Sequence, residues 1–127
     1  MCGFVGFTGH LVGGDEILKN MMDTIIHRGP DSAGTHIDSD VSLGFRRLSI
    51  IDLDSGTQPM YNETNDIVIV FNGEIYNYQE LKKDLIEKGH VFRNNSDTET
   101  LIHSYEEYGE AMLDRLRGMF AFVIWDG

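Results

Sequence analysis

Three short apolar runs predict the central strands of this chain. Residues 2–7 are apolar at nearly every position and are punctuated by glycine, and residues 67–71 and 119–125 share this unbroken apolar character. A short run without polar alternation is typical of a strand that is buried on both faces. Two further strands are predicted at 32–37 and 41–47, on either side of a polar turn.

Amphipathic segments between these runs predict helices. Residues 15–27 carry one apolar stripe and end before Gly29 and Pro30. Residues 78–88 place leucine and isoleucine on one side and charged residues on the other, up to Gly89. Ser96 followed by Glu99 is a capping-box pattern. It opens a helix with an apolar stripe of Leu101, Ile102, Tyr105 and Tyr108, followed by a further helical turn at 112–116.

Together these elements predict an α+β fold. Strands buried on both faces need covering layers above and below, and two face-to-face sheets with helices outside provide them. The connections are mostly too short for parallel crossovers, so the sheets should be largely antiparallel. Residues 1–127 form one predicted domain, and the chain stops just after a buried strand. We therefore expect it to be the truncated part of a longer protein.

Composition narrows the class of protein. The 127 residues are 41% apolar, which is typical of a globular domain, and the net charge of −11 argues against a nucleic-acid partner. A single cysteine excludes an internal disulfide and favours a reducing compartment. The first residues lack the features of a signal peptide, and no apolar run approaches the roughly 20 residues that span a bilayer. We expect a cytoplasmic protein without a membrane partner.

The single cysteine is the first candidate for chemistry. If the initiator methionine is removed, Cys2 becomes the N-terminal residue and carries a thiol and an α-amine together. An α-amine has an ordinary pKa of about 7.7–8.0 and is partly unprotonated at neutral pH, so it can act as a general base. This is the arrangement of N-terminal nucleophile hydrolases. The alternative is that Cys2 is a small buried residue at the start of a strand.

The histidines give no metal signal in the sequence. The five of them show no metal-ligand spacing with one another or with Cys2, so no metal site is predicted. A Cys–His hydrolase would need a histidine beside Cys2, and His27 is the one histidine placed next to a conspicuous turn. Its other interpretation is a histidine at a helix C-terminus, where the helix dipole favours it.

Asn72 and Gly73 allow two interpretations. Asn-Gly between strand-like runs is the strongest short hairpin signal, and the local sequence alone favours that structure. In the functional interpretation, a side-chain N–H of Asn72 and the backbone N–H of Gly73 form an oxyanion hole.

Four charged residues could hold a substrate. Arg46 and Arg47 end a predicted strand, and a guanidinium can bind a carboxylate through two hydrogen bonds, although a solvated pair is the simpler interpretation. Glu74 and Asp97 could each pair with an ammonium group, or serve only as a turn acid and a helix N-terminal acid. Together with Cys2 and the two N–H donors, these groups suffice to hold a free amino acid and attack its side-chain amide.

At this point the sequence resembles a known family, the class II glutamine amidotransferase domain, and within it the branch of the glutamine-hydrolysing asparagine synthetases. The shared stretches occur in the family's order and cover the whole chain. They are Met-Cys-Gly at 1–3, His-Arg-Gly-Pro-Asp at 27–31, Arg-Leu-Ser-Ile-Ile-Asp at 47–52, Gln-Pro-Met at 58–60, Phe-Asn-Gly-Glu-Ile-Tyr-Asn at 71–77, Ser-Asp-Thr-Glu at 96–99 and Gly-Met-Phe-Ala-Phe at 118–122.

The resemblance implies a role for each matching residue. Cys2 would be the nucleophile, with its own α-amine as base, and Asn72 and Gly73 would form the oxyanion hole. Arg47 would bind the α-carboxylate of the substrate, and Glu74 and Asp97 its α-ammonium group. Further substrate contacts would come from Leu48, Ser49, Ile50 and Ile51.

The resemblance also implies a fold and partners. The fold would be a four-layer α/β/β/α sandwich, the substrate L-glutamine, and the product ammonia for an ATP-dependent synthetase domain that these residues do not include. ATP and magnesium would belong to that domain, and no cofactor is expected in this one. A sheet that ends early would leave an unpaired edge, which favours self-association into a homo-oligomer. The competing hypothesis is a catalytically silent fragment that binds glutamine or another chain.

Overall fold

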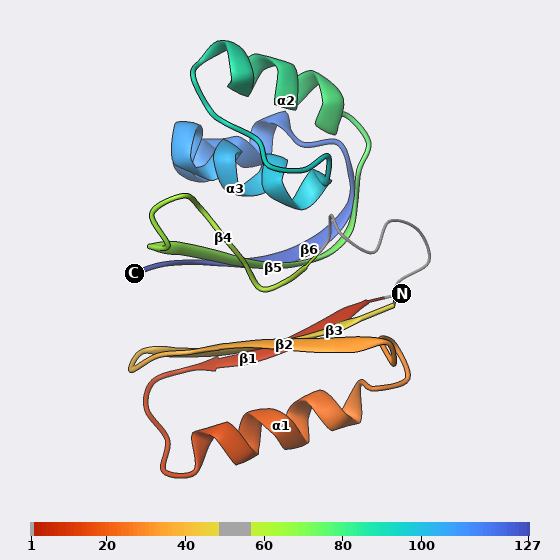
Figure 1. Cartoon of the computed structure of the whole chain (residues 1–127), viewed down its shortest axis with the longest axis vertical. Coiled ribbons are helices and arrows are strands. Elements are labelled where there is room, and N and C mark those ends of the chain that lie inside the picture. The colour runs from red at the N-terminus through yellow and green to blue at the C-terminus, as the bar shows by residue number, and fades with distance from the viewer. Residues whose placement is uncertain (1, 49–56) are drawn as a thin grey trace.

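The computed structural model describes residues 2–48 and 57–127. Two antiparallel three-stranded sheets pack face to face, and helices lie against their outer faces (Figure 1). The α+β class and the two antiparallel sheets expected from the sequence are therefore confirmed. In the described part of the chain, no helix is long and apolar enough to cross a membrane.

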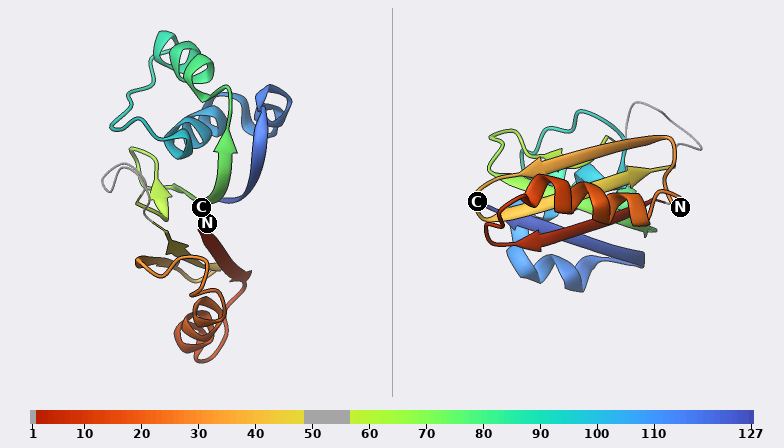
Figure 2. Two further views of the ribbon diagram at one scale, coloured as in Figure 1. Left: turned by 90° about the vertical axis from the view of Figure 1, so that its right-hand side faces the viewer. Right: turned by 90° about the horizontal axis from the view of Figure 1, so that it is seen from below.

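The first sheet has the strand order β1-β3-β2. Its strands are β1 (Gly3–Thr8), β2 (Ser32–Ile37) and β3 (Val41–Arg47), and the last two have the bounds predicted from the sequence. Helix α1 (Gly14–Thr24) crosses the outer face of this sheet, as the view from below in Figure 2 shows. A Cβ at Gly44 would lie 2.6 Å from Met22 Sδ, so the missing side chain lets the helix approach the central strand.

The second sheet has the order β4-β5-β6. Strand β5 (Ile67–Ile75) pairs along its whole length with β6 (Gly118–Asp126). The short strand β4 (Met60–Tyr61) was not predicted. Two helices cover this sheet, α2 (Tyr78–Glu87) and α3 (Asp97–Tyr108), followed by the 3-10 segment η1 (Gly109–Arg115), and Figure 1 shows α3 between the sheet and α2.

The molecule has two apolar cores on either side of β5. Ile67, Ile69 and Phe71 pack towards α3, whereas Val68 and Val70 pack towards the first sheet. The inter-sheet core also contains Val41, Leu43 and Phe45, with Cys2, Phe4 and Trp125 packed against it. Side chains that alternate along a strand point to opposite faces, so β5 supplies both cores at once.

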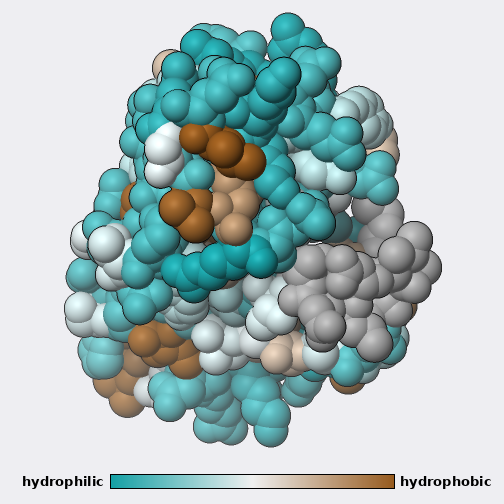
Figure 3. Space-filling view, turned by 45° about the horizontal axis from the view of Figure 1, so that its top comes forward, coloured by the Kyte–Doolittle hydropathy of each residue, from teal (hydrophilic) through white to brown (hydrophobic). Residues whose placement is uncertain are grey.

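The prediction of two-sided burial holds for β5 and is wrong for β1 and β6. Residues 67–71 are all buried, whereas β1 is only partly buried and most residues of β6 are exposed. The reason is their position in the described sheets, because β5 is central and β1 and β6 lie at the edges. Figure 3 shows a face on which hydrophilic side chains dominate, with small hydrophobic patches between them.

Candidate active site

Strand β3 directs an arginine between the two sheets. Val41, Leu43 and Phe45 face the inter-sheet core, and Arg47 continues the same alternation. Arg46 points the other way, and its Nε donates a hydrogen bond to the carbonyl oxygen of Gly29 at 2.9 Å. The alternation thus separates two adjacent arginines, one against the turn after α1 and one towards the space between the sheets.

Strand β5 directs polar groups into the same space. Val68 and Val70 face the inter-sheet core, and Asn72 and Glu74 follow them at the same period of two. Asn72 is half-buried and Glu74 is exposed, so the apolar core gives way to a polar rim along the strand. The apolar part of the strand therefore fixes which face of the sheet carries the candidate site.

Cys2 lies where β1 begins, beside the end of β3. Gly3 pairs with Arg46 in the antiparallel register, which brings the start of the chain to the last residues of β3. The backbone N–H of Leu48 points to Cys2 Sγ at 3.5 Å, and Arg28 Nε donates a hydrogen bond to the Cys2 carbonyl oxygen at 3.1 Å. These two contacts fix the position of Cys2 beside the end of β3.

A cavity of about 680 Å³ lies between these strand ends. Seven of the residues that the sequence predicted for the site line it: Cys2, Arg47, Leu48, Asn72, Gly73, Glu74 and Asp97. Phe45 and Phe71 contribute apolar wall from the two sheets. The predicted contacts of Ser49, Ile50 and Ile51 lie outside the described residues.

Asn72 and Gly73 do not form a hairpin, so the structure favoured by the local sequence is wrong. Both lie within β5 and pair with Ala121 and Phe120 of β6. Gly73 has a φ of +144°, and a Cβ there would lie 2.1 Å from the carbonyl oxygen of Met119. The missing side chain therefore lets β5 and β6 approach closely here. At this position the backbone of Gly73 lines the cavity beside Asn72.

Asp97 reaches the cavity from the first residue of α3. Its Oδ2 accepts a hydrogen bond from the backbone N–H of Ile75 at 3.1 Å, which ties the helix to the end of β5. Burial raises the pKa of the Asp97 carboxyl above its ordinary value of 3.8, and the negative charge of Glu74 raises it further, against the hydrogen bonds from backbone N–H groups. Two carboxyl groups in one pocket are suited to an ammonium ligand, because its positive charge favours the charged form of both carboxyl groups.

Gln58 supports the cavity and was missed by the sequence analysis as a site residue. It is buried, and its side-chain amide pairs with the backbone of Phe71, accepting from the N–H at 2.6 Å and donating to the oxygen at 3.1 Å. Its Nε2 also lies 3.5 Å from Thr98 Oγ1 at the start of α3. This side chain joins β5 to α3 directly before Asn72. A glutamine beside a proline carries no local signal for such a role.

His27 is not among the described residues that line the cavity. The helix predicted over 15–27 ends at Thr24 as α1, and His27 lies in the following turn. Its predicted place at a helix C-terminus is therefore wrong by one turn. Other residues of this motif contact the site: Arg28 Nε donates a hydrogen bond to the Cys2 carbonyl oxygen, and the backbone N–H of Asp31 donates one to the carbonyl oxygen of Arg47.

Comparisons with known proteins agree on the family. A family model described as a glutamine amidotransferase domain matches residues 1–127. Asparagine synthetase [glutamine-hydrolyzing] 1 of Bacillus subtilis is 50% identical over 99% of this chain, and asparagine synthetase [glutamine-hydrolyzing] 2 of Arabidopsis thaliana is 43% identical over the same share. The chain covers 21% and 22% of those two proteins, so it spans about a fifth of their length.

Solved structures support the same fold. The glutamine phosphoribosylpyrophosphate amidotransferase of B. subtilis matches 99% of this chain and 35% of its own, with a TM-score of 0.78 at 21% identity. A structure described as the allosteric regulatory enzyme of purine biosynthesis matches 98% of this chain with a TM-score of 0.80 at 22% identity, and is likewise covered to 35%. At these identities the likeness concerns the fold alone.

Proposed function

This chain belongs to the glutamine amidotransferase domain family, and from that premise we propose that it hydrolyses L-glutamine to glutamate and ammonia through a Cys2 thioester. The observation that carries the proposal is the convergence of Cys2, Arg47, Asn72, Gly73, Glu74 and Asp97 on one cavity. They come from the beginnings and ends of four different elements. If each of these residues had only a structural role, nothing would require them to lie around the same cavity.

The proposed pocket holds the ends of the amino acid by charge. The guanidinium of Arg47 binds the α-carboxylate from the first sheet. The carboxyl groups of Glu74 and Asp97 bind the α-ammonium group from the side of the second sheet. The side-chain amide of glutamine then extends towards Cys2, and the apolar walls of Phe45 and Phe71 contact its methylene groups.

The reaction proceeds in two halves. The Cys2 thiol passes its proton to the free α-amine, and the sulfur attacks the side-chain carbonyl carbon. The oxyanion accepts hydrogen bonds from the Asn72 amide and the Gly73 N–H. The carbon–nitrogen bond breaks as the leaving nitrogen takes the proton from the α-ammonium, releasing ammonia. Water then adds to the thioester and gives a proton to the amine, and glutamate leaves as the thiol is restored.

Removal of the initiator methionine is part of this proposal. With Met1 attached, the nitrogen of Cys2 is an amide and cannot act as a base. We expect the intact mass of the purified protein to be lower than that of the full sequence by one methionine. A chain that keeps Met1 quantitatively and still hydrolyses glutamine would contradict the proposed base.

We extend the proposal to the use of the ammonia. The curated relatives are named glutamine-hydrolyzing asparagine synthetases and are about five times as long as this chain. We propose that ammonia passes to an ATP-dependent synthetase domain in the longer protein, and that any ATP and magnesium act there. A cytoplasmic location belongs to the same proposal, because a nucleophilic thiol must remain reduced.

The test is glutamine hydrolysis by the purified chain and its variants. Cys2→Ala should reduce ammonia release to background while glutamine binding persists, and Asn72→Ala should lower the rate on the order of 10²–10³-fold. His27→Ala is the matched control and should keep full activity. A glutamine-mimicking electrophile should label Cys2 in peptide mapping. Hydrolysis by the Cys2→Ala chain, or its loss in His27→Ala, would contradict the proposal.

A further inference from the structure

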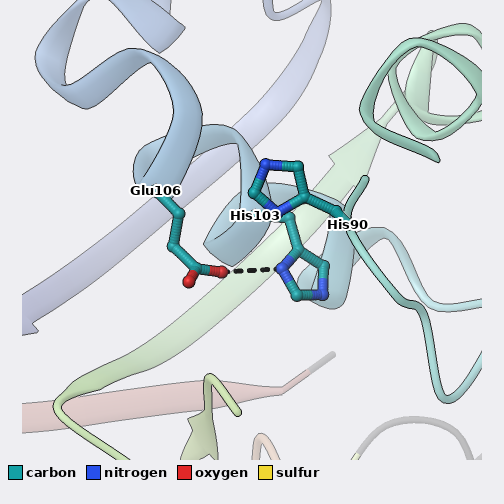
Figure 4. Close-up of side chains that lie close together, drawn as sticks. All are labelled: His90, His103 and Glu106. Atoms are coloured by element: carbon teal, nitrogen blue, oxygen red, sulfur yellow. Dashed lines mark hydrogen bonds and ion pairs between the residues drawn. The ribbon is translucent and has the colours of Figure 1, made fainter. Parts of the chain in front are cut away.

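A second cluster of chemistry-bearing side chains lies on the helix side of the second sheet. Ligand atoms of His90, His103 and Glu106 all lie within 4.8 Å of one another. Figure 4 shows them converging from two segments, with His103 and Glu106 on α3 and His90 on the connection that leads from α2. The histidines show no metal-ligand spacing in the sequence, because this cluster forms only when the connection folds back onto α3.

We propose that this cluster binds one divalent transition-metal ion, with zinc as the preferred metal. Two imidazole nitrogens and a carboxylate oxygen form a donor set that suits zinc, whereas magnesium and calcium prefer oxygen ligands. Donor atoms around a tetrahedral zinc ion stand about 3.4 Å apart for bonds of about 2.1 Å. Glu106 Oε1 now lies 2.7 Å from His103 Nδ1, and its side chain is 20% exposed, so a small rotation would open this pair to that spacing.

The surroundings of His103 suit metal binding through Nδ1, because the other ring nitrogen, Nε2, lies beside a carboxylate. His103 is 2% exposed, and its Nε2 lies 3.4 Å from Oε1 of the buried Glu99. Glu99 is itself held by the backbone N–H groups of Arg93 and Asn94, at 2.7 and 3.0 Å. With a metal on Nδ1, Glu99 would accept the proton of Nε2, as in the carboxylate–histidine pairs that orient metal ligands.

His90 has a similar arrangement. Its Nε2 lies 3.0 Å from Glu107 Oε2, so a proton shared on that side leaves Nδ1 for a metal. Its ring lies 5.2 Å from that of His103 between centroids, close enough for both to serve one ion. In each ring, a carboxylate outside the ligand set is therefore placed to accept the proton of the nitrogen that would not bind the metal.

A further carboxylate and a cavity lie beside the cluster. Glu63 Oε1 lies 3.6 Å from His103 Nδ1, and the Glu63 side chain is 40% exposed. A cavity of about 260 Å³ adjoins this point and is lined by Glu63, Glu99 and His103 among others. The excess of carboxylates here, within a chain of net charge −11, would attract a cation. Bound metal would tie the α2–α3 connection to α3.

Zinc would replace a proton in this site. His103 Nδ1 lies 2.7 Å from Glu106 Oε1, and the metal would take the place of the hydrogen between them. Binding therefore releases protons and weakens as the pH falls. The ligand residues play no part in the proposed hydrolysis of glutamine, so the two proposals can fail separately.

The test is a zinc titration of the chain carrying Cys2→Ala, which removes the thiol as a competing ligand. We expect one equivalent of Zn²⁺ to bind in competition with a chromophoric chelator, and Co²⁺ to give the visible absorption of a tetrahedral nitrogen–oxygen site. Adding His90→Gln and Glu106→Gln should weaken zinc binding by about 30-fold or more. These two residues are chosen because the buried His103 could not be replaced without risk to folding.

The matched control is His36→Gln. His36 also pairs with a carboxylate, Asp38, at 2.9 Å, but it lies on β2 outside the cluster. The His36→Gln chain should bind zinc as tightly as the parent chain. In the presence of a chelator, the double variant should retain the parent's melting temperature. Equal zinc affinity in the parent and the double variant would overturn the proposal, as would the absence of stoichiometric binding by the parent chain.

Discussion

Gly73 is constrained by its backbone as well as by its proposed role. It adopts a φ of +144°, and an added Cβ would lie 2.1 Å from the Met119 carbonyl oxygen across the strand pair. Gly73→Ala should therefore lower the free energy of unfolding by at least about 2 kcal/mol and reduce glutamine hydrolysis to near background. Chemical denaturation and an ammonia assay measure the two effects.

Gly89 offers the matched control for that variant. It has a φ of +99°, and a Cβ there would meet nothing within 4 Å. Gly89→Ala should cost about 1 kcal/mol from backbone strain alone and leave hydrolysis unchanged. Equal effects of the two variants on activity would show that the pairing with β6 is not what makes Gly73 necessary.

Asp97 should make glutamine binding depend on pH. Burial raises the pKa of its carboxyl above 3.8, and only the charged form attracts the α-ammonium group. Affinity should therefore fall as the pH drops through this raised pKa, at a higher pH than for an ordinary aspartate. Calorimetry on the Cys2→Ala chain between pH 4 and 7 would measure the affinity for glutamine. An added Asp97→Asn change should weaken binding and remove the part of the pH dependence that Asp97 causes.

The same shift has a consequence for stability. A carboxyl group whose pKa is raised in the folded state stabilises the fold most below the unfolded pKa, and this contribution is lost as the pH rises through the folded value. At pH 7 the half-buried Asp97 carboxylate is charged and therefore lowers the free energy of unfolding. The Asp97→Asn chain should be at least as stable as its parent at pH 7, and a marked loss of stability would contradict this assignment.

At the scale of the element, α3 is the helix that positions Asp97. Ser96 caps it, with Oγ accepting from the Glu99 N–H at 3.2 Å, as the sequence predicted. The Glu99 side chain does not return to Ser96 and binds the N–H groups of Arg93 and Asn94 instead. The capping-box pattern therefore marked the helix start correctly but assigned the wrong partner to its second residue.

Loss of this cap should affect both stability and binding. Ser96→Ala should lower the free energy of unfolding by about 0.5–2 kcal/mol and weaken glutamine binding, because Asp97 is the next residue. Urea denaturation and calorimetry would measure these effects. Ser39→Ala, in the exposed turn between β2 and β3, should change neither. An uncapped α3 with unchanged glutamine affinity would show that Asp97 is positioned by its bond to Ile75 alone.

The sequence predicts local structure well where turns punctuate it. Strands β2 and β3 have the predicted bounds because a polar turn separates them. It fails at Asn72 and Gly73, because a tertiary strand pairing overrides a local turn signal. The choice between Arg46 and Arg47 was available from the alternation of β3, since Arg47 follows Val41, Leu43 and Phe45 at a period of two.

Other features needed the folded chain. Edge and central strands differ in neighbours rather than in composition, so the apolar run of β6 could not reveal its exposed face. Gln58 is bound to Phe71 across 13 positions, and His90 meets His103 only through the fold of a connection. Contacts set by tertiary structure leave little periodic signal in a single sequence.

At the scale of the molecule, the candidate site joins two sheets that otherwise meet through an apolar core. Cys2 and Arg47 belong to the first sheet and its flank, whereas Asn72, Gly73 and Glu74 belong to the second. A ligand held from both sides should stabilise the whole sandwich rather than one half. L-Glutamine at a hundred times its Kd would add about 2.7 kcal/mol to the free energy of unfolding.

This coupling predicts a single cooperative shift in the Cys2→Ala chain, which binds without turnover. The melting temperature should rise by about 8–12 °C, to the same extent when it is followed by Trp125 fluorescence and by far-ultraviolet circular dichroism. Trp125 lies on β6 and packs against the inter-sheet core, so its signal reports the contact between the sheets. D-Glutamine, which cannot present both charged ends and the amide in the same order, should give no shift. A shift in only one of the two signals would mean that glutamine stabilises one sheet without the other, and the pocket would then not be shared between them.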